Sequence, residues 1–283
     1  MTDPKWAVAT ERGRYYRDPA GGPDLISVTN VLGAGVNKSF ALVPWGAGLV
    51  ADAVIADPID TARRARLEPT ALRRELAAIP RGYTERASNR GTRIHNRAQA
   101  QVLGVPYPAD PEVEPFALQL ARWFRLWRVD LAEDVLAVET TVFHRQLGYA
   151  GTGDLWVWLR TGVMRRRQLW LVDYKTSGTK PDGTVKPDDT VYDEQPLQLT
   201  ALRRAPEWLL PDDTTEPAPR VHRTALLNLR PASHRMIEVP SGREQFRAFR
   251  GALATAKYLH TAPSSYPTVL PSWAPGAPER TAA

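Results

Sequence analysis

Two stretches decide the fold: Gly151-Thr-Gly-Asp-Leu-Trp-Val-Trp-Leu-Arg160 and Gln168-Leu-Trp-Leu-Val-Asp-Tyr-Lys175. Both are rich in β-branched and aromatic residues, so strands are predicted over residues 153–160 and 168–174. Thr161-Gly162 and the basic Arg165-Arg166-Arg167 lie between them, where the tip of a hairpin is expected. If the two strands pair as a hairpin, the start of the first strand lies beside the end of the second.

This pairing brings three charged side chains together. Asp154 opens the first predicted strand, while Asp173 and Lys175 close the second and share a face because side chains alternate along a strand. Burying two carboxylates and an ammonium without a further cation would be costly. A divalent metal ion removes the repulsion, and the lysine can then orient or help to deprotonate a water that attacks phosphorus. An exposed strand end is the commoner explanation of Asp-x-Lys alone, but Gly-Thr-Gly-Asp at hairpin spacing favours a function.

The rest of the chain alternates between helical and strand patterns around this hairpin. A short hairpin is expected over residues 5–17, and residues 80–82 are expected to break the helical region. Further helices are predicted over residues 39–55, 58–67, 69–79, 83–103, 114–128, 192–204 and 242–260. Further strands are predicted over residues 135–143, 222–229 and 234–239. The order indicates an α/β fold with a central mixed sheet flanked by helices and an N-terminal helical region.

We expect one domain over residues 1–261. It divides into a hairpin and helical region over residues 1–82 and a core over residues 83–261. Residues 262–283 contain many prolines and are expected to form a flexible tail. There is no apolar N-terminal signal core and no run of about eighteen apolar residues, so a cytoplasmic protein without membrane contact is expected.

The chain contains no cysteine, which excludes disulfides, thiolate zinc sites and cysteine-ligated iron–sulfur clusters. Any metal must therefore be held by oxygen or imidazole ligands, and this favours Mg²⁺ or Mn²⁺.

The net charge of +6 and the pI of about 9.7 favour a polyanionic partner. Ten arginines lie between residues 63 and 97, against three glutamates: Arg63, Arg64, Arg66, Arg73, Arg74, Arg81, Arg86, Arg90, Arg93 and Arg97. We predict that part of this cluster binds phosphate, and the alternative is a set of solvated helix faces. The candidate nucleic-acid contacts are Arg90, Arg93 and Arg97, together with Arg165, Arg166 and Arg167 of the hairpin tip.

Three isolated polar residues add to the candidate site. His95, in Gly91-Thr-Arg-Ile-His95, lies near the start of a predicted helix, where a lone histidine is more often structural than a ligand. Glu139 shares the strand periodicity of Val135 and Ala137, and an inward carboxylate needs a partner; a place at the metal site and a place on the surface are equally compatible with this. Gln198 either binds phosphate, holds Lys175, or is an ordinary polar helix residue.

Taken in order, Gly-Thr-Arg-Ile-His95, Glu139, Gly151-Thr-Gly-Asp154, Asp173-Tyr-Lys175 and Gln198-Leu-Thr-Ala-Leu202 resemble the RecB-like branch of the PD-(D/E)XK nucleases. This branch includes the RecB nuclease domain and CRISPR-associated and phage-encoded exonucleases. Ile26-Ser-Val-Thr-Asn-Val-Leu and Pro44-Trp45 also look like the phage-encoded members. The resemblance spans residues 26–204 and implies a restriction-endonuclease-like core.

The resemblance implies that His95, Asp154 and Asp173 bind Mg²⁺ or Mn²⁺ and that Lys175 is the catalytic lysine, with Glu139 and Gln198 in support. Leu202 stands where the family has a tyrosine, so a substrate contact is lost or moved. Many relatives carry cysteines for an iron–sulfur cluster, whereas this chain has none. The expected activity is exonuclease action on single- or double-stranded DNA in recombination, repair or phage DNA processing. The alternatives are a non-catalytic DNA-binding module on the same fold and a structure-specific endonuclease.

Overall fold

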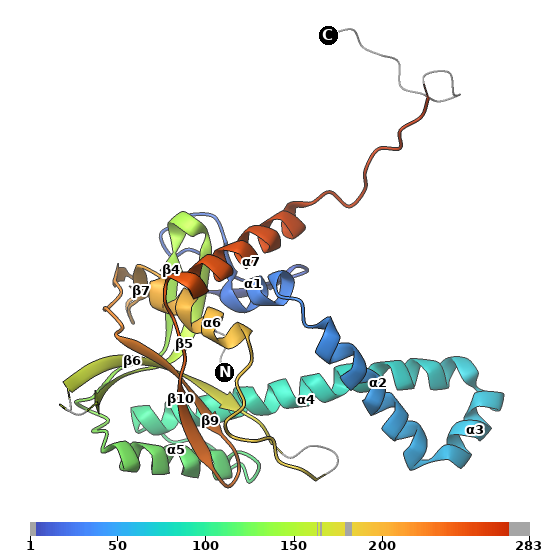
Figure 1. Cartoon of the computed structure of the whole chain (residues 1–283), viewed down its shortest axis with the longest axis horizontal. Helices are drawn as coiled ribbons and strands as arrows, with labels where there is room; N and C mark the ends of the chain where they lie inside the picture. The colour runs from blue at the N-terminus through green and yellow to red at the C-terminus, as the bar shows by residue number, and fades with distance from the viewer. Residues whose placement is uncertain (1–3, 163, 165, 179–182, 272–283) are drawn as a thin grey trace.

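The computed structural model describes residues 4–162, 164, 166–178 and 183–271. A central β-sheet has helices on both faces, and a helical arm projects from this body (Figure 1). The sheet combines parallel and antiparallel pairs, so the predicted α/β class with a mixed sheet flanked by helices is confirmed.

The described residues contain ten strands and seven α-helices. The strands are β1 (Ala7–Thr10), β2 (Gly13–Tyr16), β3 (Leu25–Ser27), β4 (Val135–His144), β5 (Tyr149–Thr161), β6 (Arg166–Thr176), β7 (Glu207–Leu209), β8 (Thr215–Pro217), β9 (Arg223–Leu229) and β10 (His234–Glu238). The helices are α1 (Val28–Gly35), α2 (Ser39–Ala56), α3 (Pro58–Leu67), α4 (Pro69–Leu103), α5 (Glu114–Trp127), α6 (Glu194–Arg204) and α7 (Arg243–Thr261), with a 3₁₀ turn η1 (Arg145–Leu147).

Strand β5 is the branch point of the sheet. Along one edge it pairs with β4, antiparallel. Along the other edge it pairs first with β3, parallel, at Tyr149 and Ala150, and then with β6, antiparallel, from Leu155 onward. Residues 151–154 therefore lie between the two partners on that edge. Beyond β6 the sheet continues with a parallel pairing to β9 and an antiparallel one to β10.

A hydrophobic core lies between each face of the sheet and the helices that cover it. On one face, α1, α6 and α7 contribute buried residues such as Val31, Leu199 and Phe249. On the other face, Ile94 of α4 and the apolar side of α5, including Trp123, pack on β5, β6 and β9. The amphipathic pattern of residues 114–128 thus marks a helix that covers the sheet, as its periodicity predicts.

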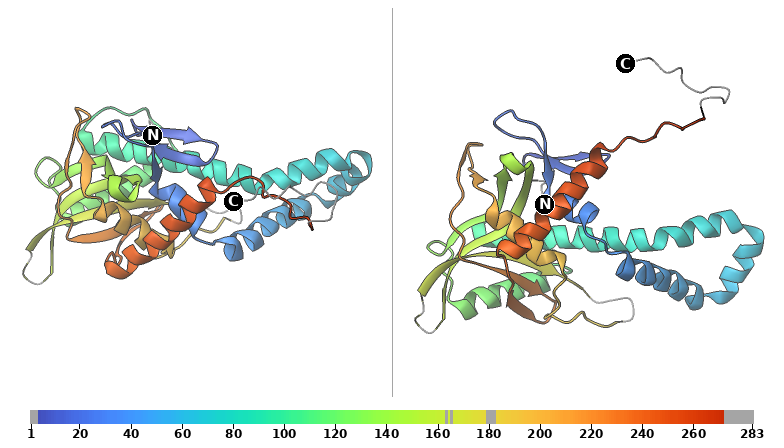
Figure 2. Two further views of the ribbon diagram at one scale, coloured as in Figure 1. Left: turned by 90° about the horizontal axis from the view of Figure 1, so that it is seen from above. Right: turned by 45° about the horizontal axis from the view of Figure 1, so that its top comes forward.

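The arm consists of α2, α3 and the N-terminal half of α4 (Figures 1 and 2). The predicted break at residues 80–82 is wrong, because α4 continues through Pro80. The proline lies against α2: a Cβ placed on Gly46 would be 3.6 Å from Pro80 Cγ. Packing between the helices therefore outweighs the backbone hydrogen bond that proline removes. The expected boundary between residues 82 and 83 falls inside this continuous helix.

Most other predicted elements are confirmed to within a few residues, but short ones escaped prediction. The 5–17 hairpin is β1–β2, and residues 58–67 coincide with α3. No residue pattern predicted β3, β7 or β8, which have three residues each. Helix α1 was also not predicted; its first turn is capped by Ser27 Oγ, which accepts a hydrogen bond from Asn30 N at 3.0 Å. Of the expected tail, residues 262–271 contain no helix or strand, and residues 272–283 lie outside the described residues.

Candidate metal centre

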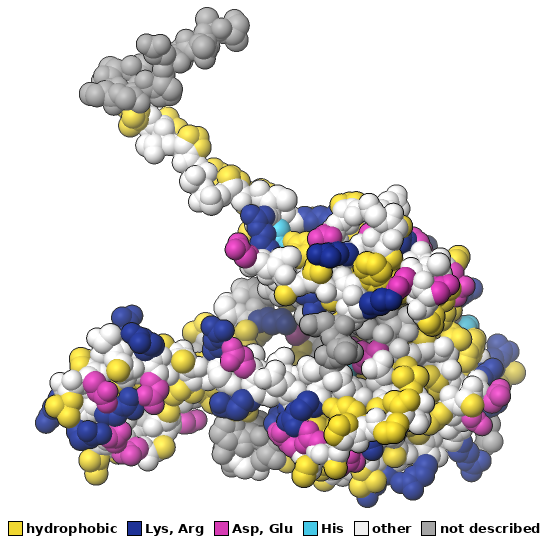
Figure 3. Space-filling view, turned by 180° about the vertical axis from the view of Figure 1, so that it is seen from behind, with side chains coloured by type: hydrophobic (Ala, Val, Ile, Leu, Met, Phe, Trp, Pro, Cys, Tyr) yellow, Lys and Arg dark blue, Asp and Glu magenta, His cyan; other side chains and the backbone are white. Residues whose placement is uncertain are grey.

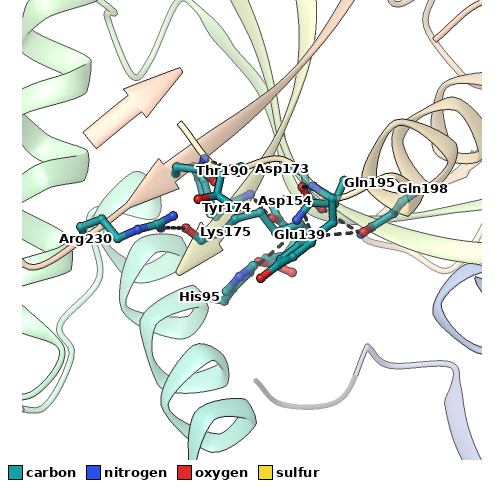
Figure 4. Close-up of polar contacts among 12 residues, drawn as sticks. His95, Glu139, Asp154, Asp173, Tyr174, Lys175, Thr190, Gln195, Gln198 and Arg230 are labelled. Carbon is teal, nitrogen blue, oxygen red and sulfur yellow. Dashed lines mark hydrogen bonds and ion pairs between the residues drawn. The ribbon is translucent and has the colours of Figure 1, made fainter. Parts of the chain in front are cut away.

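The candidate centre lies where β5 and β6 diverge. Their ladder ends at the pair Leu155 and Val172, one residue before the two aspartates. Beyond it, Asp154 Oδ2 accepts a hydrogen bond from the backbone N–H of Tyr174 at 2.5 Å. The Asp154 carboxylate thus accepts the hydrogen bond that a backbone carbonyl of β5 would accept if the strand pairing continued. It lies beside the end of β6, as the predicted hairpin implies (Figure 4). Asp154 is inside β5 rather than at its start, because the strand extends back to Tyr149 to pair with β3.

The glycines before Asp154 are required by packing. A Cβ on Gly153 would lie 2.4 Å from the Trp156 ring, and a Cβ on Gly151 would lie 2.7 Å from Leu202. Leu202, which stands where the resembled family has tyrosine, is buried and fills the space beside this strand. Because glycine has no side chain, α6 and the Trp156 ring can pack closely against the backbone that carries Asp154.

We expect Gly153→Ala to destabilise the fold by about 2 kcal/mol, because an extra methyl group in a filled core displaces the Trp156 ring. Gly251→Ala is the matched control: it is helical and nothing lies within 4 Å of its added Cβ. That variant should be stabilised by about 0.5–1 kcal/mol, since alanine favours helix. Urea unfolding of both proteins measures the difference, and equal stabilities would contradict the packing role of Gly153.

Three donors from three elements converge at this fork. His95 comes from α4, Glu139 from β4 and Asp154 from β5, and one potential ligand atom from each lies within 4.8 Å of the others. His95 Nδ1 is 3.3 Å from Glu139 Oε1 and 3.4 Å from Asp154 Oδ1. The family resemblance implies Asp173 rather than Glu139 as the third ligand, and that assignment stays a prediction. Asp173 stands outside this group of three donors and contacts Lys175 instead.

Glu139 reaches the centre through an unusual backbone conformation. Its φ of +47° lies in the left-handed region, which costs a non-glycine residue about 1–3 kcal/mol. The β4–β5 register also shifts between Val135 and Ala137. Simple alternation from Val135 therefore does not describe how Glu139 is oriented. The surrounding sheet holds the residue in this conformation, and its carboxylate contacts His95.

Lys175 is fixed by two partners on its own side of the sheet. Its Nζ lies 2.6 Å from Asp173 Oδ2 and donates to Gln198 Oε1 at 3.1 Å. Gln198 Nε2 in turn donates to Asp173 Oδ1 at 2.9 Å, which closes a three-residue ring (Figure 4). The predicted shared face of Asp173 and Lys175 is confirmed. Asp173 Oδ2 is buried, and Lys175 Nζ is the cation that balances its charge.

The pKa shifts of the buried side chains at this centre reflect several carboxylates that lie close to one another. Burial alone lowers the pKa of His95, but Asp154 and Glu139 outweigh it and raise the pKa well above its usual value. Burial and the neighbouring carboxylates raise the pKa of Glu139 and of Asp173. Burial opposes ionisation of Asp154, yet the cationic His95 and Lys175 lower its pKa. Burial likewise opposes the charge on Lys175, and Asp173 and Asp154 raise its pKa.

These residues fit a hard divalent cation. Ligand atoms that share one octahedral ion at about 2.1 Å lie roughly 3 Å apart, close to the 3.3 and 3.4 Å that separate His95 Nδ1 from the two carboxylates. Carboxylate oxygens and a neutral imidazole are common ligands of divalent metal ions. Asp173 Oδ2, which pairs with Lys175, is a further carboxylate oxygen at the same fork. His95, Glu139 and Asp154 can therefore hold a metal ion, and the lack of cysteine rules out a cysteine-ligated cluster.

A narrow cleft of about 150 Å³ opens onto the centre. The N-terminal segment contributes Arg14, Tyr16 and Thr29 to its lining. Tyr16 Oη is 3.0 Å from Thr152 Oγ1, next to Gly151 on β5. Sequence reasoning predicted this hairpin but assigned it no role. Its position depends on the pairing of β3 with β5, for which a three-residue strand carries no recognisable pattern.

The described candidate nucleic-acid arginines have acidic partners or lie at the end of the β5–β6 hairpin. Arg90, Arg93 and Arg97 form ion pairs with the acidic residues Asp110, Glu112 and Glu114. Arg167 pairs with Asp134, at the end of the β5–β6 hairpin roughly 20 Å along the strands from Asp154. Arg166 is exposed at the same tip, and Arg165 lies outside the described residues. Their contact with nucleic acid stays a prediction.

A buried arginine supports the end of β6. Arg230 is 2% exposed and donates to the carbonyl oxygens of Lys175, Leu229, Lys186 and Pro187 at 2.9–3.1 Å. It joins the strand end that carries Lys175 to the segment leading towards α6 (Figure 4). The sequence gives no sign of this role, because all four acceptors are backbone atoms.

Arg230→Met should lower the free energy of unfolding by on the order of 3 kcal/mol, because four buried carbonyl groups lose a charged donor. Arg235→Met is the control, since Arg235 is on the surface and pairs with Asp188. Its loss should cost less than about 1 kcal/mol. Urea unfolding distinguishes the two variants, and an equally small effect at both positions would contradict the support assigned to Arg230.

Comparison with protein-family models and with curated proteins found no match to this chain.

Proposed function

We propose that the chain is a metal-dependent hydrolase with a restriction-endonuclease-like core. The observation that carries the proposal is the His95, Glu139 and Asp154 donor set beside a lysine that Asp173 and Gln198 hold in place. Within that class, we propose that it is a deoxyribonuclease that hydrolyses phosphodiester bonds. Exonuclease action in recombination, repair or phage DNA processing follows the sequence resemblance.

Each side chain has a distinct part in the proposed reaction. His95, Glu139 and Asp154 hold the ion, with Asp173 Oδ2 available as an additional oxygen. When bound, Mg²⁺ or Mn²⁺ supplies a Lewis acid for the phosphate and favours deprotonation of water. Lys175 donates to the attacking water and orients it towards phosphorus. Asp173 and Gln198 fix the position of Lys175 Nζ, so the ammonium needs little reorganisation during the reaction.

Arg14 is the proposed phosphate contact in the lining of the cleft. We expect Arg14→Ala to raise KM for DNA by about tenfold, because a charge-assisted hydrogen bond to phosphate is lost. Metal affinity should not change. Arg17→Ala is the matched control, since the exposed Arg17 directly follows β2 and is not among the residues that line the cleft. Steady-state cleavage at several DNA concentrations gives KM, and equal KM values for the two variants would contradict this role.

The activity is tested with matched end-labelled linear DNA and covalently closed circular DNA, in single- and double-stranded forms, with Mg²⁺, Mn²⁺ or EDTA. Metal-dependent loss of linear DNA with intact circles is expected. Cleavage of circles would show that the protein is an endonuclease rather than an exonuclease. Salt-sensitive DNA binding without cleavage in the presence of either metal would show that the protein is a non-catalytic DNA-binding module.

A further inference from the structure

Helix α2 presents an apolar surface that the chain itself does not cover. All of α2 is described and none of its residues is buried, although its mean hydropathy is 1.6. Phe40 is 77%, Val43 66% and Ile55 73% exposed. Hydrophobic side chains are visible among the charged ones on the arm in Figure 3. A continuous apolar surface of this kind is uncommon on a soluble monomer and marks an interaction site.

The apolar side chains surround α2 rather than forming one stripe. Successive helical residues rotate by about 100°, so Phe40, Leu42, Val43, Trp45 and Ile55 point in directions spread around the axis. One of them, Trp45, packs edge-on against Tyr83 of α4 with ring centroids 5.5 Å apart. A helix that is apolar on all sides is either buried in a protein core or spans a membrane.

By length and composition α2 is apolar enough to cross a membrane, which departs from the expectation that the chain contains no such segment. The connections of the arm oppose a span. Lys38, just before α2, pairs with Glu194 of the body at 2.7 Å, and α4 returns from the arm to the body at His95. If α2 crossed a bilayer, α4 would have to cross back with Arg73, Arg74 and Arg81, at a high desolvation cost.

The composition of α2 also opposes adsorption to a lipid surface. Interfacial helices have a strong apolar face and a polar face rich in lysine and arginine. Helix α2 contains neither lysine nor arginine, and its one charged residue is Asp52. Burial against protein is therefore the arrangement that the apolar side chains of α2 favour.

We propose that the arm packs against the arm of a second copy of this chain. One side of α2 forms the contact: Phe40, Val43 and Ile55 lie within about 120° of one another around the axis, and Pro44, Ala47 and Ala51 are exposed between them. At on the order of 100 Å² each these six side chains expose roughly 600 Å², of the same order as the 800 Å² that each partner buries in a stable interface. A two-fold symmetric contact places the same apolar patch on both sides, so each copy supplies the complementary surface. This inference does not depend on the proposed nuclease activity.

Light scattering of the intact chain at micromolar concentration tests the association, and the mass of two chains is expected. The double variant Val43→Asp with Ile55→Asp should weaken dimerisation by about tenfold or more, since charges would be buried in an apolar contact. Leu126→Asp is the matched control, because Leu126 on α5 is 72% exposed and lies outside the arm. It should leave the mass unchanged. Circular dichroism of each variant reports whether the fold is kept.

The absence of native cysteine allows a direct test of which surfaces meet. Single variants Phe40→Cys, Val43→Cys and Ile55→Cys are oxidised in parallel with Leu126→Cys. A disulfide-linked dimer from the arm positions, but not from position 126, is expected. Monomeric wild-type chain, or equal cross-linking at position 126, would overturn the proposal. A monomer that floats with phosphatidylcholine–phosphatidylglycerol vesicles would also overturn it, in favour of lipid contact.

Discussion

Asp154→Asn is expected to lower DNA cleavage by about a thousandfold or more, the largest effect that we predict. The substitution keeps the shape of the side chain and an acceptor for the Tyr174 N–H, but it removes one negative charge from the donor set. Affinity for Mn²⁺ should fall with the activity. Titration calorimetry of Mn²⁺ binding and single-turnover cleavage of end-labelled linear DNA measure the two losses.

The exposed carboxylate Asp24 provides the control, and Asp24→Asn should change neither cleavage nor metal affinity. An Asp154→Asn protein that binds Mn²⁺ and cleaves DNA like the wild type would remove the metal centre from the proposal. Loss of cleavage with unchanged Mn²⁺ affinity would show that Asp154 acts without binding the ion.

Lys175→Met should reduce the rate of DNA cleavage by roughly a thousandfold while leaving Mn²⁺ binding intact. Lys175 is not one of the three metal donors, and its ammonium contacts Asp173 and Gln198. Methionine retains most of the apolar length of lysine, so the variant tests the charge. Single-turnover cleavage and Mn²⁺ calorimetry on the same preparation separate the chemical step from metal binding.

Lys257→Met is the matched control, because Lys257 is on α7 and donates to the Leu147 carbonyl away from the centre. It should retain wild-type activity. Cleavage by Lys175→Met within tenfold of wild type would mean that another group orients the water. Loss of Mn²⁺ binding would mean that Lys175 mainly holds the metal-binding residues in position where β5 and β6 diverge.

The part of the candidate centre that is local in sequence could be predicted. Asp154, Asp173 and Lys175 are on two strands joined by a short connection, and pairing of neighbouring strands brings their ends together. Alternation along β6 then places Asp173 and Lys175 on one face, as their contact confirms. The same local reasoning identified Gln198 as a candidate partner of Lys175, and the structure shows this hydrogen bond.

Residues that are distant in sequence could not be placed in the same way. Whether His95 is a structural residue or a ligand depends on how α4 crosses the sheet. Glu139 lies beside His95 with a positive φ, and no residue pattern predicts that backbone conformation. Sequence reasoning also failed at Pro80, where contact with α2 keeps the helix continuous. Arg14 was missed because its place at the cleft follows from the β3–β5 pairing.

The class of the fold, the β5–β6 hairpin and the aspartate–lysine pair follow from residue patterns, because strand alternation and turn spacing act over a few residues. Only the folded chain brings the Glu139 carboxylate beside His95 and Asp154, adds Arg14 to the lining of the cleft and leaves α2 exposed. These features depend on contacts between segments tens of residues apart. Such contacts are selected by packing and desolvation of the whole chain, which no local pattern encodes.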